Sequence, residues 1–246
     1  MDTTLSIALS HQVAMRRQMD IIANNIANMS TTAFKRENVM FGEYLKEAEG
    51  EDHKSLRKIS YVQDFGISRN MTDGQLETTG NSFDVALSGD GMFQVQKQNG
   101  ELAYTRNGHL ALSDEYTLIT STGQEILDKA GKPIQLSENT KDIEISSDGT
   151  ISSRTAGQIA IINVVAFADN STLKKIGDNM FTTNSETRPA TDYSIIQGMT
   201  ETSNVQPIIE VTRMIQVSRS YISTAKLMDK LQEAENKAIN QLAKVG

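Results

Sequence analysis

The sequence predicts an α+β protein in which two long terminal helices form a coiled-coil-like helical domain around an inserted antiparallel β-rich domain. Glycine is absent from residues 1–41 and 199–245, whereas the stretch 66–157 holds eleven of the sixteen glycines. Apolar residues recur at alternating spacings of three and four near both ends, which is typical of helices. Between the ends the apolar period falls to two, which is typical of strands.

The N-terminal segment keeps a heptad pattern, in which seven of eight seam positions are apolar. Its seam positions are Leu5, Ala8, Gln12, Met15, Met19, Ile22, Ile26 and Met29. Residues 30–32, Ser-Thr-Thr, are poor helix-interior residues and indicate where the helix stops. We therefore expect one helix of about 28 residues.

The C-terminal segment repeats this pattern over some 35–40 residues. Its seam positions are Met214, Val217, Tyr221, Thr224, Met228, Leu231, Glu235, Ala238, Leu242 and Val245. Ser203 or Asn204 is expected to cap the helix, with Pro207 accommodated in its first turn, where a missing N–H costs nothing.

The middle of the chain alternates predicted strands with tight turns. Strands are expected at residues 82–87, 92–96, 116–119 and 159–167. The expected turns, chosen because Asn, Asp and Gly accept positive φ, are Asp73-Gly74, Asp90-Gly91, Asn99-Gly100, Asn107-Gly108 and Asp148-Gly149.

Three regions follow from these patterns. Residues 1–36 and 200–246 form the terminal helical domain, residues 37–75 an extended connector, and residues 76–199 the β-rich domain. Within the connector, residues 46–58 are charged and weakly periodic, as in a mobile or partner-dependent segment.

Composition excludes several kinds of chemistry. The chain has no cysteine and three histidines, so thiol catalysis, disulfides and multi-histidine metal sites are not expected. Ser-x-x-Lys occurs three times without companion motifs, and Gly89-Asp90-Gly91 lacks the third glycine and the helix of a phosphate loop. Asp84, Asp90, Asp114 and Asp148 are dispersed and mostly turn-bound. We therefore expect no enzyme activity, cofactor, metal or small-molecule substrate.

The formal charge of -7 argues against a nucleic-acid partner, which normally requires a basic surface. No apolar run approaches the length of a membrane span, and the N-terminus lacks the basic region of a cleaved secretory signal. Export by a route that leaves the chain unprocessed remains compatible with the sequence.

Two features favour assembly. The apolar seams could pair within one chain as a helical hairpin, but a long hairpin leaves apolar surface uncovered, so we favour contacts between molecules. Asn24, Asn25 and Asn28 adjoin the first seam, where buried amides need partners. Their clustering predicts hydrogen bonds that set helix register.

At these amides the sequence resembles the bacterial flagellar basal-body rod and hook family. The resemblance is carried by residues 22–35 (IANNIANMSTTAFK), 82–95 (SFDVALSGDGMFQV), 104–108 (YTRNG), 148–151 (DGTI) and 201–205 (ETSNV), which occur in the family's order. Residues 5–20 are most similar to the proximal-rod type. The chain departs from the family pattern at Ala33, Met92 and Glu115-Tyr116, where Gly, Phe and Asp-Gly are usual.

The resemblance implies a structural subunit of the proximal rod that polymerises through its terminal helices into the helical drive shaft. It implies copies of itself and other proximal and distal rod proteins as partners, a periplasmic place in the flagellum basal body, and type III export in transit. The subunit-interface residues it implies, together with the seams, are Met15, Met19, Ile22, Asn24, Asn25, Ile26, Asn28, Phe34, Lys35, Ser203, Asn204, Val205, Met214, Val217, Tyr221, Met228 and Leu231. The alternatives are a distal-rod protein of the same family, or a non-flagellar β-rich surface module or hydrolase with helical arms.

Overall fold

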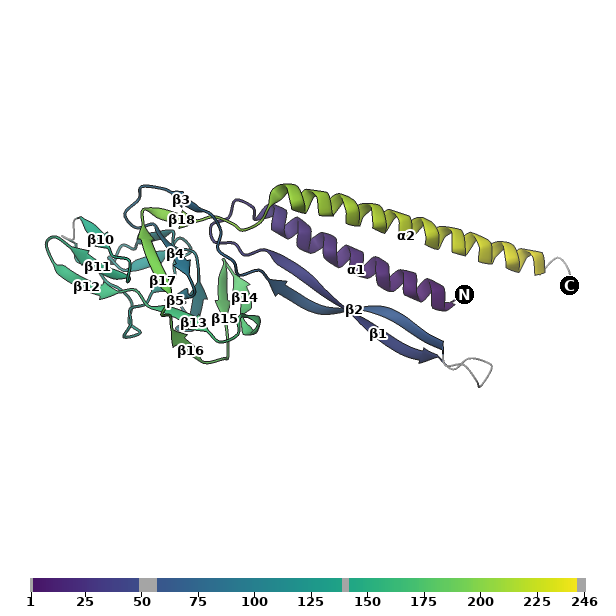
Figure 1. Ribbon diagram of the computed structural model, residues 1–246, viewed down its shortest axis with the longest axis horizontal. Helices are drawn as coiled ribbons and strands as arrows, with labels where there is room; N and C mark the ends of the chain where they lie inside the picture. The colour runs from purple at the N-terminus through teal and green to yellow at the C-terminus, as the bar shows by residue number, and fades with distance from the viewer. Residues whose placement is uncertain (1, 49–56, 139–141, 243–246) are drawn as a thin grey trace. The chain divides into compact units, whose positions relative to one another are not determined.

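The computed structural model describes residues 2–48, 57–138 and 142–242 and shows an α+β chain with two long helices and many antiparallel strands (Figure 1). The chain divides into two compact units. Unit 1 comprises Met1–Ala27, Glu37–Asn70 and Gln206–Gly246. Unit 2 comprises Asn28–Arg36 and Met71–Val205. Residues 49–56 of the predicted connector and Val245 of the predicted seam lie outside the described residues.

Unit 1 consists of both long helices and a β-hairpin. Helix α1 (Asp2–Ala27) has 26 residues and α2 (Pro207–Leu242) has 36, close to the lengths expected from the heptads. Strands β1 (Glu37–Ala48) and β2 (Arg57–Arg69) pair antiparallel, and the register shifts between Met40 and Phe41. Helix α1 contacts both α2 and the hairpin (Figure 1). No described helix is long and apolar enough to cross a bilayer.

The start of α2 differs from the expected cap. The helix begins at Pro207, and the Gln206 carbonyl accepts the first hydrogen bonds, from the Ile209 and Glu210 N–H groups at 3.1 Å each. Proline suits this first position because its φ is helical and its missing N–H needs no partner. The prediction of a Ser203 or Asn204 cap is therefore wrong, since both residues precede the helix by several positions.

Unit 2 contains the remaining strands. They are β3 (Leu76–Thr78), β4 (Val85–Gly89), β5 (Met92–Gln96), β6 (Leu102–Thr105), β7 (Leu110–Leu112), β8 (Leu118–Thr120), β9 (Glu125–Ile126), β10 (Ile143–Ile145), β11 (Thr150–Ser153), β12 (Gly157–Ile161), β13 (Val164–Phe167), β14 (Lys174–Gly177), β15 (Met180–Thr182), β16 (Thr187–Pro189), β17 (Tyr193–Gln197) and β18 (Met199–Glu201). The 3₁₀ turn η1 (Asn170–Thr172) lies between β13 and β14.

The largest sheet has the order β14-β15-β6-β5-β9-β8-β7, with β13 added to β5 and β16 to β13. Smaller sheets pair β10-β11-β12, β17 with β4, and β18 with β3. The last two pairs join strands more than 100 residues apart, so unit 2 closes only when the chain returns from its far end. Its main core includes Val85, Leu87, Phe93, Val95 and Ile195, all buried.

Two strand predictions need correction, although residues 92–96 match β5 and residues 82–87 overlap β4. The expected strand at 159–167 is two strands in different sheets, because the Asn163 N–H turns to the Leu127 carbonyl at 3.0 Å. The strand expected from Tyr116 begins at Leu118 instead, because Tyr116 adopts a left-handed φ of 60° in a turn.

Gly74 and Gly108, two of the expected turn glycines, are required by close packing and not by a positive φ. Gly91, Gly100 and Gly149 do have positive φ, but Gly74 and Gly108 do not. A Cβ at Gly108 would lie 1.7 Å from the Val85 carbonyl oxygen, and one at Gly74 would lie 1.9 Å from that of Thr202. These two positions need glycine because another backbone passes too close for any side chain.

Candidate subunit interface

The predicted interface residues on the two helices differ in how much of each side chain the single chain covers. Ile22 and Val217 are buried at 4% and 7% exposure. The half-buried positions are Met15, Met19, Ile26, Met214, Tyr221, Met228 and Leu231, and Asn24 is exposed. Between the helices, His11 Nδ1 lies 3.3 Å from Thr224 Oγ1. Part of each seam is thus used within the molecule, and part remains accessible to a second molecule.

Asn25 ties α1 to both other parts of unit 1. Its amide nitrogen donates to the Glu37 carbonyl at 2.8 Å and to Glu210 Oε2 at 3.2 Å, and its amide oxygen accepts from the Glu37 N–H at 3.0 Å. All three residues are buried. Because both amide atoms meet the Glu37 backbone, the side chain acts like one more paired residue of β1. Asn25 thus makes buried hydrogen bonds to β1 and α2, and their role in setting helix register stays a prediction.

The carboxylates of Glu37 and Glu210, the two residues that Asn25 bonds, have basic neighbours. Arg69 Nε lies 3.2 Å from Glu37 Oε1, and Arg213 Nη1 lies 3.5 Å from Glu210 Oε1. Asn28 makes a local contact just beyond α1, where its amide oxygen accepts a hydrogen bond from Thr31 Oγ1 at 3.1 Å. The sequence pattern did not identify Glu37 or Glu210, because an acidic residue in a strand or a first helical turn is ordinarily solvated.

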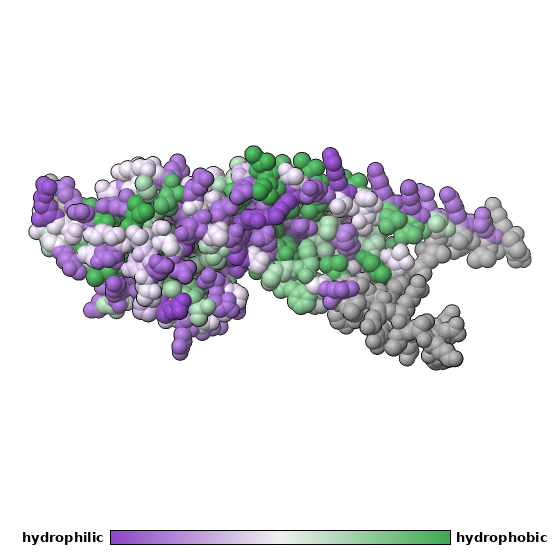
Figure 2. All heavy atoms as spheres, in the orientation of Figure 1, coloured by the Kyte–Doolittle hydropathy of each residue, from purple (hydrophilic) through white to green (hydrophobic). Residues whose placement is uncertain are grey.

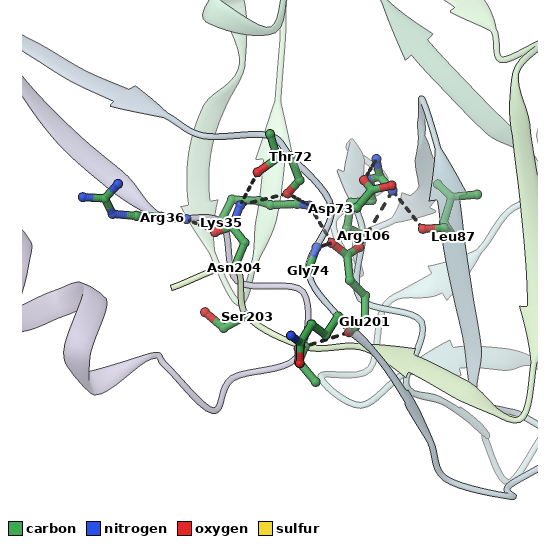
Figure 3. A network of polar contacts seen from close by, with 12 residues as sticks. Lys35, Arg36, Thr72, Asp73, Gly74, Leu87, Arg106, Glu201, Ser203 and Asn204 are labelled. Carbon is green, nitrogen blue, oxygen red and sulfur yellow. Dashed lines mark hydrogen bonds and ion pairs between the residues drawn. The ribbon is translucent and has the colours of Figure 1, made fainter. Parts of the chain in front are cut away.

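The second cluster of predicted residues lies in unit 2, around the buried ion pair of Lys35 and Glu201 (Figure 3). Lys35 Nζ donates to Glu201 Oε1 at 2.6 Å and to the Thr72 carbonyl at 2.9 Å. The same carboxylate oxygen accepts from the Gly74 N–H at 2.7 Å. Both charged side chains are 1% exposed. Burial lowers the pKa of Lys35, although the Glu201 carboxylate counteracts that effect.

Arg106 extends this cluster into the β-sheets. It donates to the Leu87 carbonyl at 3.0 Å, to the Gly89 carbonyl at 2.6 Å and to Asp73 Oδ1 at 2.9 Å (Figure 3). Its Nη1 also lies 3.8 Å from Glu201 Oε2, a buried oxygen without a hydrogen bond. Five separate stretches of unit 2, at residues 35, 72–74, 87–89, 106 and 201, therefore meet at this cluster.

The remaining predicted residues of unit 2 also act within the chain. Asn204 Oδ1 accepts from the Arg36 N–H at 2.7 Å, and its amide nitrogen donates to the Thr72 carbonyl at 2.8 Å. Ser203 Oγ accepts from the Val205 N–H at 3.2 Å, and Val205 is buried. Phe34 is buried beneath Lys175, whose Nζ lies 4.3 Å from the ring centroid. These residues hold together the ends of the segments that enter and leave unit 2.

Ala33 shows how unit 2 accommodates a departure from the family pattern. Its φ is 56°, a left-handed conformation that glycine adopts more readily. The residue is buried, and its N–H donates to the Glu201 carbonyl at 2.8 Å. Alanine adopts this left-handed conformation here at the cost of local strain.

The charged groups of the second cluster hold separate segments of unit 2 together. The charged groups around Lys35 are hydrogen-bonded to backbone or to one another, and no described set of three His, Cys, Asp or Glu side chains is placed to hold a metal. The surface of unit 1, in contrast, carries many large apolar side chains (Figure 2). On α2 these are Ile208, Ile209, Val211, Ile215, Ile222 and Leu227.

Known protein families match both terminal helices and part of the β-rich insert. Residues 5–35 match the family described as flagella basal body rod protein, residues 86–153 the flagellar hook protein FlgE/F/G D1 domain, and residues 196–242 the flagellar basal body rod FlgEFG protein C-terminal region. The FlgF protein of Caulobacter vibrioides is 41% identical over 248 residues, covering 100% of both chains. The chain belongs to the flagellar basal-body rod protein family.

Other relatives include both FlgF and FlgG rod proteins. FlgF of Mesorhizobium japonicum is 32% identical over 98% of both chains. FlgG of Buchnera aphidicola subsp. Acyrthosiphon pisum is 33% identical over 87% of this chain and 89% of its own. This rod protein is therefore most like FlgF, and it is a structural subunit of the flagellar basal body.

Proposed function

We propose that this rod protein is a proximal-rod subunit that polymerises through its terminal helices, with α1 and α2 packed as a coiled coil. The observation that carries the proposal is the set of half-buried apolar seam residues, among them Met15, Met19, Met214 and Tyr221, which a single chain leaves partly open. Copies of the chain and other rod proteins are the proposed partners, and the buried interface residues act by holding the fold in shape.

The same proposal covers the finer properties of the subunit. The terminal segments 1–36 and 200–246 contribute the rod core and residues 76–199 form the β-rich domain, while residues 37–75, expected as an extended connector, supply the β1–β2 hairpin of unit 1. The subunit has no catalytic activity and no cofactor or small-molecule substrate. It reaches the periplasmic rod through the flagellar export apparatus.

The matching FlgG proteins support a second candidate, a distal-rod subunit. Stepwise detergent and acid extraction of purified basal bodies separates the two. A proximal subunit should stay with the membrane ring after hook and distal rod are removed, whereas a distal subunit should leave with them. Recovery of the chain outside flagellar fractions altogether would overturn both candidates.

A further inference from the structure

Unit 1 leaves two apolar surfaces uncovered, one on the hairpin and one on α2. Phe65 is 64% exposed and Met40 44% exposed, and together we call them the hairpin knob. Ile208, Val211, Ile215 and Ile222 are 83%, 46%, 49% and 50% exposed, and we call them the outer stripe. Both surfaces are separate from the seams, and surfaces of this kind mark interaction sites.

A β-bulge presents the knob. The pairing passes from Met40↔Gly66 to Phe41↔Asp64, so Phe65 is the extra residue on β2. Its ring occupies the space where a side chain of Gly42 would be, since a Cβ there would lie 1.8 Å from a ring carbon. Phe65 therefore shares the face of Met40 and Gly42. Bulges are a common means of re-aiming a side chain.

The knob faces away from α1. Asp64, on the other face of the bulge, reaches α1 through an ion pair of 3.3 Å with Arg17. Side chains on opposite faces of a strand point in opposite directions, so Phe65 and Met40 point away from that helix.

The outer stripe likewise faces away from α1. Glu210 and Thr224 contact α1 through Asn25 and His11. At 100° per residue, the stripe positions fall on the opposite side of α2. The stripe is confined to the first half of the helix, because the same face continues as Lys226, Asp229 and Glu233.

The two surfaces lie at the same height along unit 1. The contacts Asn25–Glu210 and His11–Thr224 show that the helices run antiparallel, and Arg17 lies between Asn25 and His11 on α1. Because Arg17 contacts Asp64, the bulge is level with the part of α2 that carries the stripe. Side-by-side copies could therefore bring a knob to a stripe without sliding along the helix axis.

Charge does not oppose this pairing. Strand β1 has a net charge of -2 and β2, with Arg57, Lys58 and Arg69 against Asp64, has a net charge of +2, so the hairpin as a whole is neutral. Residues 207–222 have Arg213 and Arg219 against Glu210, a net charge of +1. The contact between the two surfaces therefore depends on apolar burial and not on net charge.

We propose that the hairpin knob of one copy of this chain packs on the outer stripe of α2 of the next copy. The contact is heterologous, because two different surfaces meet, and such a contact repeats into an open row rather than closing a dimer. The inference rests on the proposed function, which brings copies together, and adds a specific second contact outside the seams.

The absence of cysteine in the natural chain allows a clean cross-linking test. The Phe65→Cys, Ile215→Cys double variant, assembled into basal bodies and treated with a short bismaleimide, should give a ladder of dimers and larger multimers. Either single variant should give none, whereas co-expressed single variants should give dimers only. Phe65→Cys with Lys226→Cys is the matched control, because Lys226 lies on the same helix face about 16 Å further along.

The outcomes separate this contact from the proposed function. If the natural chain is present in basal bodies and the double variant yields no ladder, or yields adducts only with other rod proteins, the contact between copies is wrong. Cross-linking of Phe65→Cys alone would indicate a two-fold contact and also overturn it. Absence of the natural chain from basal bodies would instead contradict the proposed function.

A second readout tests whether the contact matters for assembly. Ile215→Asp should lower the amount of subunit recovered per basal body at least tenfold, whereas Lys226→Asp should leave it unchanged. The circular dichroism of both purified variants should match that of the natural chain, because both positions are exposed. Equal incorporation of both variants would contradict a role for the outer stripe.

Discussion

At the scale of single residues, the buried pair of Lys35 and Glu201 is the most constrained feature of unit 2. Its members come from segments 166 residues apart, and both are almost fully buried. Because the pKa of Lys35 is lowered by burial, the unfolded chain holds that proton more tightly than the folded chain. At pH values below the folded-state pKa of Lys35, burial of its charge therefore lowers the free energy of unfolding. The pair fixes the positions of its two segments and adds little net stability.

This leads to a prediction about removing one or both charges. Lys35→Met should destabilise unit 2 by about 3–5 kcal/mol, because it leaves the Glu201 carboxylate buried without its main partner. The double variant Lys35→Met, Glu201→Gln should be less destabilised by at least about 1 kcal/mol, since no unpaired charge remains. Urea unfolding followed by circular dichroism measures both.

Lys97→Met provides the control, because the Lys97–Glu101 pair is on the surface and Glu101 is 64% exposed. That change should cost at most about 1 kcal/mol. A Lys35→Met variant as stable as Lys97→Met would show that the buried pair does not hold unit 2 together.

The sequence identified site residues that belong to a periodic apolar pattern or a recognisable motif. It did not identify residues that matter only through contacts with distant parts of the chain. Asn25 stood out as an amide on an apolar helix, and Lys35 was named through the family-like motif of residues 22–35. Arg106 and Glu210 gave no such signal, because their importance comes from contacts with residues far along the chain. Gly74 and Gly108 were recognised as special, but their reason, a close backbone approach, requires the fold.

At the scale of elements, the helices were the most predictable part. Heptads identify α1 and α2 within a few residues at each end, because one face of each helix must be apolar along its length. The β1–β2 hairpin was not foreseen, since its mixture of charged and apolar residues follows no strict alternation. The break between β12 and β13 was also missed, because a continuous apolar run does not show where a chain changes sheets.

Asn25 offers a prediction at this scale, because it joins three elements. Asn25→Asp keeps the size of the side chain but turns its donor into an oxygen that faces the Glu37 carbonyl and the Glu210 carboxylate. We expect unit 1 to lose about 3 kcal/mol or more of stability, from an unpaired buried charge and lost hydrogen bonds. Hydrogen exchange of the α1 and β1 amides measures the loss.

Asn24→Asp is the matched comparison. It makes the same chemical change one residue earlier, at an exposed position, and should alter stability by less than about 1 kcal/mol. Equal protection of α1 amides in both variants would mean that Asn25 does not set the register of unit 1.

At the scale of the whole molecule, the two units differ in how much apolar surface each leaves exposed. Unit 2 has a buried apolar core, and its buried charged groups around Lys35 and Glu201 contact one another. Unit 1 leaves apolar side chains exposed on its helices and hairpin. Contact with neighbouring subunits would bury this apolar surface of unit 1, as expected for a subunit of a helical assembly. We therefore expect assembly to depend on the terminal helices and not on the turns of the β-rich unit.

The most direct test compares seam and turn variants by the amount of subunit in purified basal bodies. Met19 and Tyr221 are half-buried in the single chain, so a lysine at either can reach solvent in the monomer but not in a packed rod. Met19→Lys and Tyr221→Lys should each give soluble subunit that is absent from basal bodies, because burying the charge costs several kcal/mol. Asp114→Ala, at an exposed turn of unit 2, should be incorporated normally. Normal incorporation of both seam variants together with loss of the turn variant would contradict the account.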